Sequence, residues 1–188
     1  MSDSKHTFFF HGQSIYSNWH MKDFELYGQK FNCGEQAMMW AKAMLFGDTE
    51  KAEEILEAKT PKEQKALGKQ VKPFDQTFWD AVKTRMMYTV VAAKFEGDKD
   101  YQYELRKTGE TMLVEASPYD KVWGIGLDEK KAKQTPEQNW PGQNLLGKML
   151  TKYRNDHVKD QVKQMSLDDL TKVGVKAVQK KSGYDMSM

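Results

Sequence analysis

Cysteine is nearly absent from this chain of 188 residues, in which Cys33 is the only one. A single cysteine excludes an internal disulfide and a zinc site built on several thiolates. Long apolar runs are absent too, and the mean hydropathy is -0.80. The longest apolar-looking stretch, residues 37–46, is interrupted by Lys42, whereas a membrane-spanning helix needs about 20 apolar residues. The sequence therefore predicts no transmembrane helix and no disulfide scaffold.

A strong charge of one sign is also absent. The chain has 29 Lys and Arg against 27 Asp and Glu, a net charge of +2. This balance argues against a protein that wraps polyanions in general, whose basic residues would be in clear excess. Residues 1–6 lack the apolar core of a signal peptide, and no internal repeat or low-complexity segment is visible. We therefore expect a soluble, cytoplasmic, single-domain protein with no membrane partner.

Aromatic residues are plentiful: they make up 12% of the chain and include five Trp. Trp19, Trp123 and Trp140 lie in polar, glycine-containing surroundings rather than in apolar runs. Such residues form either flat walls for a planar ligand or the amphipathic edge of a core. The pattern alone leaves both interpretations open.

The periodicity of apolar residues predicts a mainly helical α+β domain with a small β-sheet. Helices are expected to begin and end at capping residues, including a capping box at Thr60–Glu63. The segment 118–140 is expected to be irregular, and its length suggests a functional loop. The expected strands cover 6–11, 24–31 and 111–116. The expected helices cover 34–46, 49–58, 77–95, 100–107, 144–157 and 166–181, and a further helix begins at Thr60.

Glu35 and Lys42 are seven residues apart in one predicted helix. Seven residues are nearly two turns, so both side chains are expected on the same face. Because the rest of that helix is apolar, burial is expected to raise the pKa of the carboxylate and lower that of the amine, as in general acids and nucleophilic lysines. Alternatively, Glu35 complements the helix dipole and Lys42 extends its amine to solvent.

Two further stretches contain candidate binding residues. Glu115, Asp120 and Trp123 surround a strand-to-loop transition that ends in Gly124-Ile-Gly126, where glycines permit close backbone approach to a ligand or simply form a tight turn. Residues 140–147 begin a helix whose first amides are a candidate phosphate seat or an ordinary helix cap. Arg154, Arg85 and Lys94 are candidates for additional positive charge.

Metal binding is not indicated. His6, His11, His20 and His157 do not have the spacing of metal ligands. Residues 159–181 form a basic, amphipathic predicted helix, a pattern typical of a packed appendage with a solvated face.

Taken as an ordered set, these residues resemble the YbiA-like N-glycosidase family, also called NADAR. The resemblance covers residues 8–156 and depends on the number and order of its motifs. Lys69 departs from it, because many members have Arg there. The matching positions are Ser17-Asn18-Trp19, Gly34-Glu35-Gln36, Lys42, Leu67-Gly68-Lys69, Trp79, Arg85, Lys94-Phe95, Thr108-Gly109, Val114-Glu115, Asp120 to Leu127, Trp140 to Gly147, and Arg154.

The resemblance implies a YbiA-like domain at 6–157, a C-terminal helical extension at 158–188, and cleavage of N-glycosidic bonds without a cofactor. Some family members hydrolyse the ribosylamino-pyrimidine phosphates of early riboflavin biosynthesis, releasing ribose 5-phosphate. Others remove ADP-ribose from guanine in nucleic acid. The predicted substrate is therefore a nucleotide-like small molecule or an ADP-ribosylated guanine.

The resemblance also implies roles for individual residues. Glu35 or Asp120 would stabilise the transition state and transfer protons, and Lys42 would attack C1 of the sugar as a Schiff base. Trp79 or Trp123 would stack on the base. Phosphate would be held by Lys69, Arg85, Arg154 and the helix start at Asn144. The predicted substrate-binding set also includes Asn18, Trp19, Glu115 and Gly124.

Two other functions stay open at this point. A non-catalytic module would bind ADP-ribose or a nucleotide in the same pocket without turnover. An interaction protein would use its C-terminal helix to dock a partner. The presence of Glu35, Lys42 and Asp120 together favours the enzyme, since a binder needs no such combination.

Overall fold

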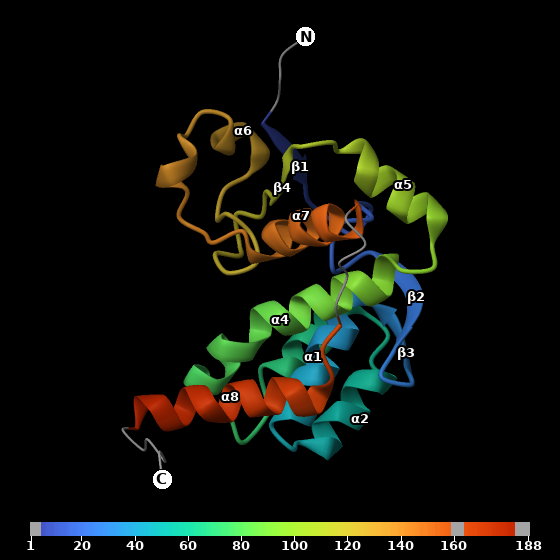
Figure 1. The fold of residues 1–188 in the computed structure, drawn as a ribbon, viewed down its shortest axis with the longest axis vertical. Helices are drawn as coiled ribbons and strands as arrows, with labels where there is room; N and C mark the ends of the chain where they lie inside the picture. The colour runs from blue at the N-terminus through green and yellow to red at the C-terminus, as the bar shows by residue number, and fades with distance from the viewer. Residues whose placement is uncertain (1–4, 159–163, 183–188) are drawn as a thin grey trace. The chain divides into compact units, whose positions relative to one another are not determined.

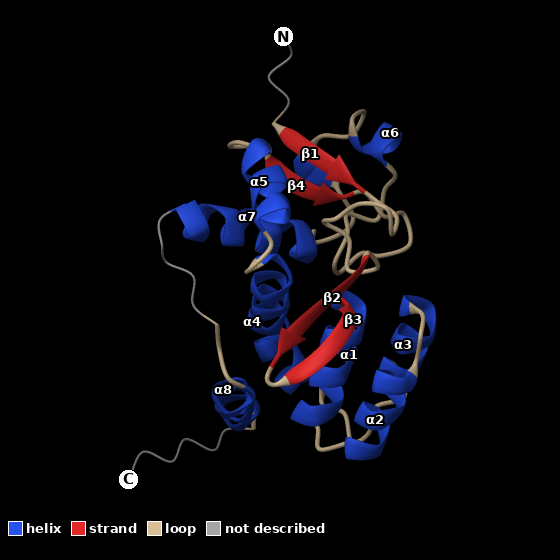
Figure 2. Ribbon diagram, turned by 90° about the vertical axis from the view of Figure 1, so that its right-hand side faces the viewer, coloured by secondary structure: helices blue, strands red, loops and turns tan. Residues whose placement is uncertain are grey.

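A computed structural model describes residues 5–158 and 164–182 of the chain. The described residues form helices and two short pairs of strands, which can be followed in Figures 1 and 2. The elements in chain order are β1 (His6–Phe9), β2 (Met21–Leu26), β3 (Gln29–Cys33), α1 (Gly34–Leu45), α2 (Thr49–Glu57), α3 (Pro61–Gly68), α4 (Gln76–Phe95), α5 (Lys99–Lys107), β4 (Met112–Glu115), α6 (Glu129–Ala132), the 3₁₀ helix η1 (Glu137–Asn139), α7 (Leu145–Val158) and α8 (Leu167–Lys181).

The chain divides into two compact units that are interleaved in the sequence. Unit 1 comprises residues 1–21 and 91–162, and unit 2 comprises residues 22–90 and 163–188. One boundary falls inside α4, between Val90 and Val91. The two units are described separately below.

Unit 1 is built on a parallel pair of strands. β1 pairs with β4 in the register His6 to Met112 and Phe9 to Glu115. The helix α7 packs on β4 and contacts α5. Next to the strands, Val114, Ile125 and Ala132 form a buried apolar cluster that Phe8, Met112, Leu127 and Trp140 extend.

The segment expected to be irregular contributes to this core. It holds α6 and η1, and Ile125 is fully buried. Asp128 begins α6 by accepting a hydrogen bond from the amide of Lys131. Its length thus reflects packing as well as loop structure.

Unit 2 is a helical cluster around α1, which contacts α2, α3, β3 and α8 (Figure 2). The helix α1 carries small and apolar residues on several sides, and Ala37, Ala41 and Ala43 are fully buried. Helix α3 begins with the predicted capping box, in which Thr60 and Glu63 each accept the other's backbone amide. Helix propensity and capping therefore agree with the burial pattern here.

The strand expected over residues 24–31 is wrong. The structure has two strands there, β2 and β3, joined at Tyr27 and Gly28. Both residues have positive φ, 54° and 73°, which is the backbone of a tight hairpin turn. The sequence did not reveal this turn because Tyr27, which occupies it, is a residue type that favours strands.

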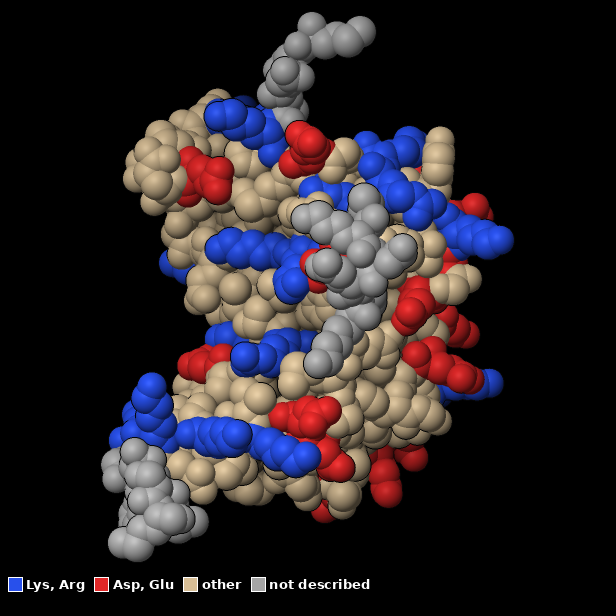
Figure 3. Space-filling view, viewed as in Figure 1, with Lys and Arg blue, Asp and Glu red and all other residues tan. Residues whose placement is uncertain are grey.

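The helical predictions are confirmed to within a few residues, and the α+β class is confirmed with them. The small amount of sheet is confirmed as well; its strands form two two-stranded sheets, β1–β4 and β2–β3. Figure 3 shows Lys and Arg side chains interspersed with Asp and Glu on the face in view, as the near-neutral charge predicts.

Candidate active site

Glu35 lies in the first turn of α1, two residues after the N-cap Cys33. Cys33 has extended backbone and its Sγ accepts a hydrogen bond from the amide of Gln36. Only 7% of Glu35 is exposed. A buried carboxylate at a helix N-terminus is favoured by the positive end of the helix dipole. Glu35 is therefore a buried acid held on a rigid element.

Lys42 lies in the last turn of the same helix, in aromatic surroundings. Its ammonium donates a hydrogen bond of 2.7 Å to the carbonyl oxygen of Gly68. The Nζ atom lies 4.5 Å from the ring centre of Phe74 and 5.7 Å from that of Trp79. Burial lowers the pKa of Lys42 below its ordinary value of 10.5, because apolar surroundings disfavour the charged form.

Unit 2 thus brings together Lys42 and Trp79 of the predicted site. It also adds Phe74, a residue that sequence reasoning missed. Phe74 follows Pro73 in a loop and is 43% exposed, so no periodic pattern marked it. The only signal for Phe74 in the sequence is an aromatic residue close to a lysine in an expected loop.

Lys69 and Arg85, the two other cations predicted in this unit, lie at the surface. Lys69 directly follows α3 as its C-cap. Arg85 Nη1 donates to the carbonyl oxygen of Ala81 at 3.0 Å, within its own helix. Both side chains are accessible to a phosphate from solvent.

In unit 1, the structure brings the second group of predicted residues together at the end of β4. Glu115 is the last residue of that strand. Asp120 Oδ1 accepts hydrogen bonds from the amides of Val122 and Trp123, at 2.9 and 2.8 Å. Its carboxylate therefore holds the turn that presents Trp123, which is half-buried. Any chemical role of Asp120 must coexist with this structural one.

At the start of α7, where the sequence left a phosphate site and an ordinary helix cap open, the first amides already have partners in the protein. The amide of Asn144 donates to Gly124 O at 3.0 Å, and those of Leu145 and Leu146 donate to the carbonyl oxygens of Val122 and Trp123 at 3.1 Å each. The first donors of this helix are thus satisfied by the loop, which is the capping alternative.

Asn144 has a structural position in unit 1. Its Oδ1 accepts from the amide of Glu115 at 3.0 Å, and its Nδ2 donates to Leu113 O at 2.9 Å. The side chain is buried and fixes α7 to β4. Its backbone has a positive φ of 54°, and its side-chain amide links the start of α7 to β4.

Arg154, expected to contact phosphate, is only 3% exposed. Its Nη1 donates to Thr108 Oγ1 and to Thr111 O, at 2.7 Å each. Burial lowers the pKa of its guanidinium. The side chain thus links α7 to the turn between α5 and β4. Its guanidinium is buried and hydrogen-bonded within the protein, and it does not form a phosphate site in this structure.

Asn18 and Trp19 lie in the loop between β1 and β2, in the part of it that belongs to unit 1. Asn18 is buried, whereas Trp19 is 40% exposed. Lys94, buried in α4, donates to the carbonyl oxygens of Ile15 and Ser17 at 2.8 and 2.7 Å. Instead of adding surface charge, as the sequence suggested, Lys94 holds this loop in place.

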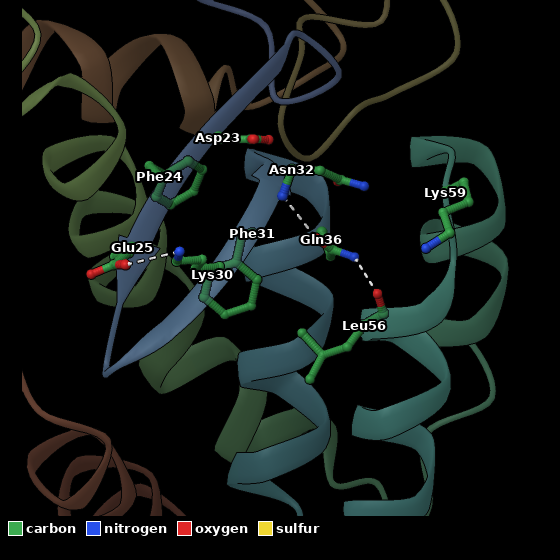
Figure 4. A pocket seen from close by; sticks show the side chains of 9 residues that line it. All are labelled: Asp23, Phe24, Glu25, Lys30, Phe31, Asn32, Gln36, Leu56 and Lys59. Carbon is green, nitrogen blue, oxygen red and sulfur yellow. Dashed lines mark hydrogen bonds and ion pairs between the residues drawn. The ribbon is translucent and has the colours of Figure 1, made fainter.

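A groove of about 450 Å³ opens between the β2–β3 hairpin and α1–α2 (Figure 4). Figure 4 shows Gln36 among the residues that line the groove: its Oε1 accepts a hydrogen bond from the amide of Asn32, and its Nε2 donates one to Leu56 O. The groove is not lined by any of the predicted site residues. It is therefore separate from the surroundings of Lys42.

Among residues 5–158 and 164–182, no three His, Cys, Asp or Glu residues are placed to hold a metal ion. Within the same ranges, no helix is both long and apolar enough to cross a membrane.

Comparison with known proteins identifies the family. Residues 7–157 match the NADAR domain. The chain belongs to the NADAR family. The fold agrees: the solved structure of the Escherichia coli protein YbiA superposes with a TM-score of 0.69 at 23% identity, covering 88% of this chain and 92% of that one.

Two relatives of this NADAR chain bear functional names. The N-glycosidase R617 of Acanthamoeba polyphaga mimivirus is 40% identical over an alignment of 161 residues that covers 79% of this chain and 95% of the relative. The riboflavin biosynthesis protein PYRR, chloroplastic, of Arabidopsis thaliana is 31% identical over an alignment of 110 residues that covers 56% of this chain but 16% of that protein. The first relative, matched over nearly its whole length, confirms the predicted reaction class: hydrolysis of an N-glycosyl bond.

Proposed function

We propose that this chain hydrolyses the N-glycosyl bond of a phosphorylated ribosyl or ADP-ribosyl substrate without a cofactor. The observation that supports the proposal most strongly is the amine of Lys42, which lies near the rings of Phe74 and Trp79 and whose pKa is lowered by burial. A lysine in such surroundings is suited to covalent attack on a sugar carbon.

The reaction needs two kinds of help. Breaking the bond between C1 and the base nitrogen creates positive charge on the sugar, which a carboxylate stabilises. The departing nitrogen needs a proton, which a carboxylic acid supplies. We assign these roles to Glu35 or Asp120, and the stacking on the base to Trp79 or Trp123.

Lys42 acts as the nucleophile in this proposal. The neutral amine forms a bond to C1 while the bond between C1 and the base nitrogen breaks, and the nitrogen leaves with a proton from the acid. Opening of the sugar ring converts the adduct to a Schiff base. Water then adds to C1, releases the sugar and restores the amine, so that the net reaction consumes one water.

Phosphate recognition in the proposal is assigned to Lys69 and Arg85. Both are exposed cations of unit 2, whereas Arg154 is buried and already engaged. Lys69 meets phosphate as a point charge, without the paired donors of an arginine. Asn18 and Trp19, on the loop that Lys94 anchors, are further candidates for substrate binding.

Two substrates fit this chemistry. The relative PYRR bears a riboflavin-biosynthesis name, which supports a ribosylamino-pyrimidine phosphate. ADP-ribosylated guanine has the same bond between a ribose C1 and a nitrogen, and a near-neutral protein can reach a single modified base without strong nonspecific binding to nucleic acid.

A parallel hydrolysis assay tests the proposal. One substrate is ADP-ribosylated guanine in an oligonucleotide and the other is a ribosylamino-pyrimidine phosphate, with mass spectrometry following restored guanine or ribose 5-phosphate. We expect wild type to turn over one of the two, and Glu35→Gln and Lys42→Met to lose at least about 100-fold in kcat. The control is Lys62→Ala, an exposed lysine on α3.

Reduction with cyanoborohydride during turnover tests the covalent step. A Schiff base on Lys42 would be trapped as a stable adduct, located by peptide mass spectrometry, and absent in Lys42→Met. Full turnover by both variants would refute the assignment. Binding of both substrates without any turnover would instead establish the alternative, a non-catalytic nucleotide-binding module.

A further inference from the structure

Helix α8 lies outside the residues that match the NADAR domain, 7–157. It is nevertheless packed into unit 2. Leu170 is fully buried, and α8 contacts α1, as Figure 1 shows where α8 lies beside it. Ser166 caps its start by accepting the amide of Asp169. The helix is therefore a built part of this unit.

Its contact with α4 is unusually close. A Cβ placed on Gly174 would lie 2.3 Å from Cε2 of Phe78, so the ring of Phe78 rests directly on the backbone of α8. Lys181 Nζ also donates to Thr77 Oγ1 at 3.0 Å. Phe78 precedes Trp79, one of the two rings beside Lys42.

From Phe78 a series of aromatic contacts leads to Lys42. The ring centres of Phe78 and Phe46 are 5.1 Å apart, and those of Phe46 and Phe74 are 5.0 Å apart. Phe74 lies against the Lys42 amine. Because Phe74 is 43% exposed, its orientation depends on the ring packed beneath it. We call Phe78, Phe46 and Phe74 the aromatic relay.

We propose that α8 is a positioning element for Lys42: through Gly174 and the aromatic relay, it holds Phe74 over the amine. This inference rests on the proposed function, in which that amine is the nucleophile. The helix α8 thus has a positioning role although it lies outside the residues that match the family. Phe74 is the side chain that limits the access of water to Lys42.

The consequence is a specific change in pH dependence. Burial is what lowers the pKa of Lys42. If Phe74 moves away, water reaches the amine, its pKa rises toward 10.5 and less of it is neutral at pH 7. Activity would then fall at neutral pH and recover as the pH rises.

Gly174→Ala is the direct test, because its Cβ meets Phe78 at a distance that forces the ring to move. We expect kcat at neutral pH to fall roughly tenfold, since small displacements of reacting groups are costly, with little change in KM. The pH profile of kcat should move to higher pH. Val175→Ala, at the adjacent exposed position, is the matched control and should behave as wild type.

Phe46→Leu provides a second test that introduces no clash. It removes the middle ring of the relay and should produce the same shift in the pH profile. Thermal unfolding of each variant shows whether the fold is retained.

The outcomes separate this inference from the proposed function. If Lys42→Met is inactive but folded Gly174→Ala and Phe46→Leu keep the wild-type kcat and pH profile, the role of α8 is refuted while the function stands. A uniform loss of activity without a shift in the pH profile would also refute it. If Lys42→Met itself is fully active, the proposed function fails first.

Discussion

Substitution of Gly147 by Ala should destabilise the protein, although alanine is the better helix former. Gly147 lies in α7 where the helix packs on β4. A Cβ there would lie 2.1 Å from Leu113 O and 2.5 Å from Asn144 Oδ1, whereas ordinary contact begins at 3.4 Å. Both neighbouring atoms belong to fixed groups, so α7 and β4 must separate.

The expected size follows from the hydrogen bonds that hold the two elements together. Asn144 joins β4 at Leu113 O and at the amide of Glu115, and Thr151 Oγ1 accepts the amide of Leu113. At about 1 kcal/mol each, their loss costs about 3 kcal/mol. The helix propensity of alanine returns about 1 kcal/mol. The net prediction is a loss of about 2 kcal/mol in the free energy of unfolding.

Urea denaturation followed by circular dichroism measures this loss, with tryptophan fluorescence as a second probe of whether the transition is two-state. Lys148→Ala, at the next and exposed position of α7, is the control and should change stability by less than about 0.5 kcal/mol. A Gly147→Ala protein as stable as wild type would refute the close approach of α7 and β4.

Charged residues of the candidate site provide the other predictions. At pH values between the lowered pKa of Lys42 in the folded protein and its ordinary pKa of 10.5, the unfolded chain binds more protons than the folded one. The free energy of unfolding should therefore rise with pH in wild type relative to Lys42→Met. Urea denaturation from about pH 7 to about pH 10 measures this, and the same dependence on pH in both proteins would contradict it. Asp120→Asn keeps an acceptor for the amides of Val122 and Trp123, so its melting temperature should match wild type while kcat falls about 100-fold; an active Asp120→Asn would remove Asp120 from the chemistry. Arg154→Met loses both Nη1 hydrogen bonds and should lose about 2 kcal/mol of stability with KM unchanged; a raised KM at full stability would restore the phosphate role.

The sequence was most informative where local chemistry determines structure. The capping box at Thr60 and Glu63 and the periodic apolar faces predicted helix positions closely, because these signals act within a few residues. The turn at Tyr27 escaped detection because its side chain favours a strand while its backbone adopts positive φ. Local propensity and tertiary structure disagreed there.

The candidate site could be predicted only in its charged and motif-bearing members. Glu35 and Lys42 were visible because ionic residues interrupt an apolar helix. Phe74 was not, because its place beside Lys42 depends on how a loop folds back. Lys94 was visible as a cation but not as the anchor of the loop at Ile15 and Ser17, roughly 80 residues away. Only tertiary structure reveals such distant partners.

The parallel pairing of β1 with β4 has a consequence for synthesis of the chain. His6 is matched with Met112, so β1 leaves the ribosome roughly 100 residues before its partner exists. During that interval Phe8 and Phe9 have no strand to pair with, and closing so long a loop costs entropy before any contact repays it. Folding of this unit should therefore be slow, because β1 cannot pair until β4 has been synthesised.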